Sequence, residues 1–178
     1  MIGKSHAFKD LFFRPSNFRD LISNAPVVIE KKDHDFVIGA QIETTFLSAD
    51  RSTRVTELLE LPVVAIECKT YLDKTMLEGS STAGNQLRVR NPNALYFVVA
   101  EWLKLTESVN LKKYDVDQIY VLRKQKNTDR EFRYADDYVK NPIFADVVIH
   151  MFEQVRDHLT ADWSASKISE ALDRGFLK

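Results

Sequence analysis

The chain of 178 residues is 44% hydrophobic and 29% charged, with a formal net charge of −1. That length suits one domain whose core folds without disulfides, and the single cysteine excludes an internal disulfide or a multi-cysteine zinc site. No apolar run approaches the roughly 20 residues that cross a bilayer, and a near-zero charge argues against a protein that only coats nucleic acid. We therefore expect a single domain over residues 1–178, without a membrane segment, in the cytoplasm.

The first third of the chain is predicted to form two helices followed by a strand hairpin. Residues 4–13 are amphipathic at helical spacing, and the serine that opens residues 16–23 can cap a second helix. Apolar strands at 27–29 and 36–42 flank a polar turn at 31–35, so these strands are expected to pair. The second helix is expected to bury its apolar side chains, which are Phe18, Leu21 and Ile22.

The middle of the chain carries the strongest strand pattern. Residues 63–71 are almost continuously apolar, which is typical of a central strand covered on both faces. A helix is predicted within residues 74–90, but Gly79 and Gly84 are expected to break it into two pieces. The stretch 55–61 is ambiguous and admits a helical turn. A turn at 91–93 and further strands at 95–100 and 118–122 complete this part.

The last part of the chain is predicted to be helical. Asn141 and Pro142 combine a helix cap with a first-turn proline. A final helix is expected to begin at Ser164 or Ser166 and to end at Gly175. Because helices and strands alternate in this order, we expect an α/β fold, namely an α/β/α sandwich around a central mixed sheet. The helix after Pro142 is expected to bury Phe144, Val147, Val148, Met151, Val155 and Leu159.

A charged tripeptide, Glu67-Cys68-Lys69, follows the apolar part of the central strand. Residues two apart on a strand point the same way, so Glu67 and Lys69 share one face and Cys68 is expected to face the core. Cleavage of a phosphodiester needs oxygen ligands for Mg²⁺, a nucleophilic water and a positive group near the phosphate. The tripeptide supplies one acid, the positive group and the Cys68 main-chain carbonyl as a further ligand. For the second acid the candidates are Asp35, then Asp33 and Glu43.

These residues carry a resemblance to a known family. Asp35-Phe36-Val37-Ile38, followed by the apolar run that leads into Glu67-Cys68-Lys69, resembles the PD-(D/E)xK nuclease superfamily. The sequence over residues 66–77 is similar to Type II restriction endonucleases, especially those that cut short asymmetric sites. The sequence departs from the family pattern at His34, where the family has a proline.

The resemblance implies a role for each matched residue. Asp35 and Glu67 would hold Mg²⁺, with Mn²⁺ as a substitute, Lys69 would be catalytic, and Gln86 on the following helix would support the site. The implied substrate is double-stranded DNA, and a double-strand cut implies a homodimer or a paired second subunit. The side chains expected to contact DNA are Lys74, Arg88 and Arg90.

Other interpretations of the same residues remain open at this point. The chain also fits a structure-specific repair or recombination nuclease, or a catalytically inactive nuclease-like subunit that binds DNA. Glu67 and Lys69 also fit a solvated pair at a strand end, although charges seldom follow so apolar a run without a partner. Gln86 is also consistent with an ordinary surface residue that has no role in the site.

Overall fold

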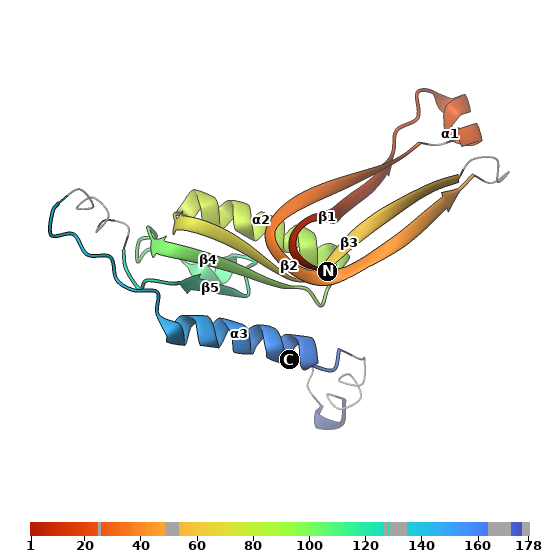
Figure 1. Cartoon of the computed structure of the whole chain (residues 1–178). Helices are drawn as coiled ribbons and strands as arrows, with labels where there is room; N and C mark the ends of the chain where they lie inside the picture. Colours follow the sequence, from red (N-terminus) through yellow and green to blue (C-terminus); the bar gives the residue numbers. More distant parts are fainter. Residues whose placement is uncertain (25, 49–53, 127, 129–134, 164–171, 176–178) are drawn as a thin grey trace.

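The computed structural model describes residues 1–24, 26–48, 54–126, 128, 135–163 and 172–175. Its described strands form one five-stranded sheet in the order β1-β2-β3-β4-β5. Figure 1 shows this sheet with one helix on either side of its central part. In chain order the elements are β1 (Ile2–Phe13), α1 (Phe18–Asn24), β2 (Val27–Leu47), β3 (Arg54–Leu72), α2 (Lys74–Arg90), β4 (Leu95–Leu103), the 3₁₀ turn η1 (Leu111–Lys113), β5 (Gln118–Val121) and α3 (Ala145–Thr160).

The sheet is mixed, as the sequence predicts. β1, β2 and β3 are antiparallel neighbours, whereas β4 and β5 run parallel to β3, so α2 is the crossover between two parallel strands. Two apolar clusters lie on the two faces, one under α2 and the other under α3. The predicted α/β/α sandwich is therefore confirmed around β3 and β4. The α2 cluster includes Ala65, Leu77, Leu87, Tyr96 and Val98, and the α3 cluster includes Val64, Ile66, Phe97, Met151 and Val155.

The helix predicted at residues 4–13 is wrong, because this segment is strand β1. Ser5 and Ala7 are buried on either side of the exposed His6, which is the period of two of a strand, and the segment pairs with β2 with two register shifts. The polar turn predicted at 31–35 is also wrong, since β2 runs through it without a break. The two short strands predicted around that turn are thus parts of one strand, and β2 forms its hairpin with β3.

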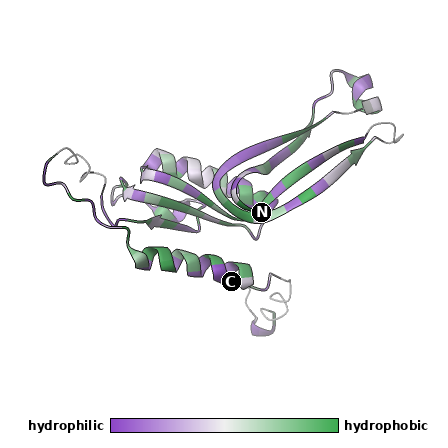
Figure 2. Cartoon of the chain, viewed as in Figure 1, coloured by the Kyte–Doolittle hydropathy of each residue, from purple (hydrophilic) through white to green (hydrophobic). Residues whose placement is uncertain are grey.

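Two arms extend from the sandwich, as Figure 1 shows. One consists of β1 and the first part of β2 and carries α1, and the other is the far part of the β2–β3 hairpin. The helix predicted at 16–23 is present, with the Asn17 side chain accepting from the Asp20 amide at 2.9 Å. Its expected burial is wrong, since Phe18 is 75% exposed and Ile22 is 70% exposed. Figure 2 shows both hydrophilic and hydrophobic residues along the arms.

Helix α2 is continuous, so the predicted break at its glycines is wrong. The Asp73 carboxylate caps it by accepting from the Met76 amide at 2.9 Å. Gly84 is buried, and a Cβ atom there would lie 2.3 Å from the Asp115 carbonyl oxygen and 3.0 Å from the Tyr96 ring. Gly84 therefore allows the helix to approach the sheet closely.

The two glycines of α2 differ in the space around them, because Gly84 is crowded and Gly79 is not, and this predicts opposite effects of alanine on stability. Gly84→Ala is expected to lower the free energy of unfolding by about 1–3 kcal/mol, because the methyl group overpacks against backbone. Gly79→Ala meets nothing within 4 Å. That matched variant is expected to raise the free energy by about 0.5–1 kcal/mol through helix propensity alone. Urea denaturation followed by circular dichroism measures both, and equal stabilities for the two variants would contradict the packing role.

The C-terminal part follows the prediction less closely. Helix α3 begins after Phe144 and not at Pro142, and the Asn141 side-chain Nδ2 donates to the Arg123 carbonyl at 3.3 Å. The predicted buried face is wrong in degree, since no residue of α3 is fully buried. Val148 and Leu159 are 38% and 42% exposed, and Val147, Met151 and Val155 are partly buried. Most of the predicted last helix lies outside the described residues. Of its described part, residues 172–174 form a helical turn before Gly175. Among the helices that the structure describes, none is long and apolar enough to span a bilayer.

Candidate active site

The site lies where β2 separates from β3. The ladder between these strands starts with Phe36 opposite Ile66, and among the described residues the part of β3 that follows pairs with β4 alone. Glu67-Cys68-Lys69 is therefore the first segment of β3 without β2 beside it. Its neighbours on β4 are Val98, Val99 and Ala100.

Asp35 lies on β2 directly before its ladder with β3 begins, and its side chain contacts β3 where main-chain pairing with β2 has stopped. Its Oδ2 accepts the Cys68 main-chain N–H at 2.8 Å, so a side-chain carboxylate satisfies a donor that a continuing β2 would have paired. The β1–β2 register shifts between Gly3 and Ser5, where β2 carries the extra residue between His34 and Val37. Such bulges redirect side chains and occur next to active sites. The irregularity thus accompanies the change of direction that brings Asp35 to the tripeptide.

The structure separates Asp35 from the two alternative acids. Asp33 lies on the exposed side of β2, where its carboxylate pairs with the His6 imidazole of β1, and this contact lowers the pKa of Asp33. Glu43 lies far along the hairpin arm, opposite Leu58. Of the three candidates, Asp35 is the one that contacts the tripeptide among the described residues.

Glu67 and Lys69 share a face, as their spacing predicts. The Lys69 Nζ donates to Glu67 Oε1 at 2.6 Å, and both side chains are largely buried, at 27% and 16% exposed for Lys69 and Glu67. The second Glu67 oxygen, Oε2, accepts from the Tyr96 hydroxyl at 3.4 Å. The carboxylate is therefore held between an ammonium and a phenol, which argues against a solvated pair at a strand end.

The expectation that Cys68 faces the core is wrong, since this residue is exposed. Its side chain points away from the Glu67–Lys69 face, and β2 no longer covers β3 at this position. Partial desolvation raises the pKa of its thiol, and the nearby charges of Asp35 and Glu67 raise it further. Cys68 thus stays a neutral thiol at neutral pH and is a poor nucleophile.

The donors at this site suit a hard cation. Among the described residues, no group of three or more His, Cys, Asp and Glu side chains is arranged to hold a metal ion. Mg²⁺, however, usually takes only one or two carboxylates and keeps several waters. Asp35 has one carboxylate oxygen that is not used by the Cys68 N–H, and each Glu67 oxygen retains a lone pair. The donor set, two carboxylates and a main-chain carbonyl, therefore fits Mg²⁺ in chemical type.

The α2 residues predicted to support the site or to contact DNA have different surroundings: Gln86 faces the strands, whereas the three cations pair with acids. Gln86 lines a cavity of about 10 Å³ together with His34 and Lys9, which puts it on the side of the helix that faces the β1–β2 arm. Arg88 pairs with Asp117 at 2.8 Å and with Asp115 at 3.6 Å. Each of the remaining two cations also has an acidic partner, in the pairs Arg90–Asp10 at 3.0 Å and Lys74–Glu78 at 3.8 Å.

Three buried polar residues near Glu67 were not predicted. Tyr96 is fully buried, and the His34 ring meets its ring edge-on at 6.0 Å between centroids. Burial raises the pKa of Tyr96 far above its usual range, and the Glu67 charge adds to this, so the hydroxyl keeps its proton. His34 Nδ1 is buried without a hydrogen-bond partner among the described residues, and the buried Ser80 hydroxyl lies beside the Tyr96 hydroxyl. Desolvation lowers the pKa of His34. Tyr96 was missed because it lies within an apolar run that indicates core.

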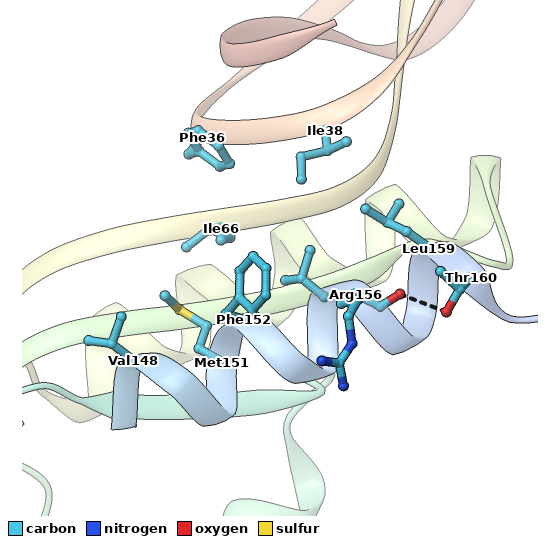
Figure 3. Close-up of a pocket in the computed structure, with 10 residues that line it drawn as sticks. Phe36, Ile38, Ile66, Val148, Met151, Phe152, Arg156, Leu159 and Thr160 are labelled. Carbon is cyan, nitrogen blue, oxygen red and sulfur yellow. Dashed lines mark hydrogen bonds between the residues drawn. The ribbon is translucent and has the colours of Figure 1, made fainter. Parts of the chain in front are cut away.

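A second hollow lies on the other face of the sheet and is chemically different. It is a groove of about 540 Å³ between α3 and the strands β2 and β3. Figure 3 shows Phe36 and Ile38 of β2, Ile66 of β3, and Met151 and Phe152 of α3 around it. No carboxylate is among the described residues that line this groove, so these residues do not make it a candidate for metal-dependent chemistry.

Similarity to known proteins extends over nearly all of the chain. The family model described as Bpu10I restriction endonuclease matches residues 1–177. Among solved structures, a chain of the native BbvCI A2B2 tetramer matches with a TM-score of 0.72 and 22% sequence identity. That match covers 89% of this chain and 57% of that chain, so this chain spans little more than half of its length. At this identity the likeness shows the fold alone. No curated protein matches the sequence.

Proposed function

The chain belongs to the Bpu10I restriction endonuclease family, and from this premise we propose that it is a metal-dependent endonuclease that hydrolyses phosphodiester bonds in double-stranded DNA. The observation that carries the proposal is the contact of the Asp35 carboxylate with the main chain of Glu67-Cys68-Lys69. This contact supports the proposal because Asp35 of β2 then lies beside the segment of β3 that carries Glu67 and Lys69. Hydrolysis with a bound Mg²⁺ uses such acids together with a positive group near the phosphate.

Each residue of the site has a distinct role in this proposal. Asp35 and Glu67 would hold Mg²⁺ through carboxylate oxygens, with the Cys68 carbonyl as a further ligand. The ion, when bound, supplies a water of lowered pKa and a positive charge beside the phosphate. The Lys69 ammonium already lies 2.6 Å from Glu67 and can donate to a phosphate oxygen where negative charge develops. Gln86 would support the site from α2.

Cutting both strands would require a second site, which we propose is brought by a second nuclease chain, identical or different. The surface that supports this is the arm carrying α1, where several large apolar side chains remain exposed. These are Phe12, Phe13, Phe18, Leu21 and Ile22. Lys74, Arg88 and Arg90 remain the proposed DNA contacts, and for Arg88 this requires exchanging an acidic partner for a phosphate.

A plasmid assay tests the proposed activity. Supercoiled DNA is incubated with the chain in Mg²⁺, in Mn²⁺, or in excess chelator, and the open-circular and linear products are measured. We expect cleavage with either metal and none with the chelator, because the carboxylates alone do not activate water. Isothermal titration with Mn²⁺ in the absence of DNA gives an independent measure of metal binding. Absence of both cleavage and metal binding would contradict the proposal.

An inactive DNA-binding subunit is the second candidate. It is favoured by one observation, namely that the described residues contain no three-residue cluster suited to a metal. Retained binding to double-stranded DNA without any Mn²⁺ binding would favour this candidate over a nuclease.

A further inference from the structure

We propose that Tyr96 is a positioning residue for the metal site, and that its hydroxyl fixes the orientation of the Glu67 carboxylate. This inference rests on the proposed function, because it assigns a support to a proposed metal ligand. The direct observation is the hydrogen bond from the Tyr96 hydroxyl to Glu67 Oε2 at 3.4 Å. Since Lys69 takes Oε1 of the same group, the two contacts together define how the carboxylate is turned.

The Tyr96 ring is itself held in place from several sides. Its main-chain N–H donates to Asp117 Oδ2 at 2.6 Å, and the same oxygen accepts from Arg88 at 2.8 Å. The His34 ring meets it edge-on, and α2 lies against it at Gly84, where no room for a Cβ atom remains. A buried ring that is packed on several sides holds its hydroxyl in position at little further entropic cost. Tyr96 can therefore act as a fixed donor.

The position of the hydroxyl also follows from the strand register. Tyr96 lies beside Ala65 in the parallel pair of β3 and β4, two residues before Glu67. Both side chains lie on the face that α2 covers, so the phenol reaches Glu67 from within the core. Groups that hydrogen-bond a metal ligand from behind orient it, and their loss typically weakens metal binding by about 10- to 100-fold.

The test is Tyr96→Phe, which removes one oxygen atom and keeps the buried ring. We expect the dissociation constant for Mn²⁺, measured by electron paramagnetic resonance without DNA, to rise about 10-fold. The metal concentration for half-maximal cleavage should rise in parallel, and excess metal should restore most of the rate. A purely structural role would not move the metal dependence in this selective way. Thermal unfolding without metal verifies that the variant is folded.

Tyr120→Phe is the matched control. Tyr120 is also buried, at 4% exposed, and its hydroxyl contacts His150 Nδ1 at 3.1 Å on the face of the sheet that α3 covers. We expect wild-type Mn²⁺ affinity for this variant. Unchanged Mn²⁺ affinity in folded Tyr96→Phe, or an equal loss in both variants, would overturn the role of Tyr96.

Glu67→Gln separates this inference from the proposed function. If the wild type and Glu67→Gln bind Mn²⁺ equally, Glu67 is not a metal ligand, and the proposed site and the inference both fail. If Mn²⁺ binding depends on Glu67 but not on Tyr96, only the inference fails. A loss of affinity in both Glu67→Gln and Tyr96→Phe supports both.

Discussion

Glu67→Gln is expected to abolish metal-dependent cleavage, with a rate at saturating DNA lower by roughly 10³-fold or more. The amide keeps the shape of the side chain and its contact with Tyr96, but it removes the negative charge that binds a cation. The carboxylate also lies beside Lys69 at 2.6 Å, so its loss leaves a largely buried ammonium without its acid. Plasmid nicking measures the rate, and a Mn²⁺ titration measures the loss of metal binding.

Two further variants test whether the loss of cleavage is specific to the metal ligand. Glu78→Gln changes an exposed acid on α2 whose contact with Lys74 is long, at 3.8 Å, and it is expected to leave cleavage unchanged. Lys69→Met should lower the cleavage rate by about 10²–10³-fold while Mn²⁺ binding persists, since it removes a donor to the phosphate and no ligand. Undiminished cleavage in either Glu67→Gln or Lys69→Met would refute the assignment of the site.

The central part of the fold was predictable because its signals are local. The apolar run before Glu67 indicates a buried strand, and the helix and strand that follow it complete a parallel crossover. The sandwich and the resemblance to restriction endonucleases, now supported by the family match over residues 1–177, both follow from that segment. In this region the sequence pattern and the tertiary structure agree.

The N-terminal part was not predictable by the same means. Residues 4–13 fit a helical face, yet their partners on β2 lie 14 to 29 residues further along the chain, from Phe13 with Val27 to Ser5 with His34, and this pairing decides the conformation. Likewise, the charged residues at 31–35 resemble a turn. In the structure they are part of strand β2, where residues 31–34 pair with β1 and pairing with β3 begins at Phe36. Long-range pairing leaves no signal within a short window of sequence.

The site was predictable in part for a related reason. Glu67 and Lys69 are fixed by strand geometry two residues apart, so their shared face follows from sequence alone. Tyr96 depends on the parallel register and on the close approach of α2 at Gly84, and neither can be deduced from the residues around Tyr96. Cys68 was misplaced because its exposure depends on the point where β2 leaves β3.

The identity of the second acid is the step on which the proposed site most depends, and Asp35→Asn tests it. The asparagine Oδ1 can still accept the Cys68 N–H that now lies 2.8 Å from Asp35 Oδ2, so the strand junction should persist. The charge and the remaining carboxylate oxygen are lost. We expect cleavage to fall by about 10²–10³-fold and Mn²⁺ binding to weaken, with little change in thermal stability.

Asp33→Asn provides the comparison, because it makes the same chemical change two residues earlier. Asp33 is exposed and pairs with His6 on β1, away from the contact that joins Asp35 to the tripeptide. We therefore expect wild-type cleavage and wild-type Mn²⁺ affinity. The reverse result, an inactive Asp33→Asn and an active Asp35→Asn, would indicate that the metal binds on the side of β2 that pairs with β1. The Asp35 carboxylate would then serve only to satisfy the Cys68 N–H where the two strands part.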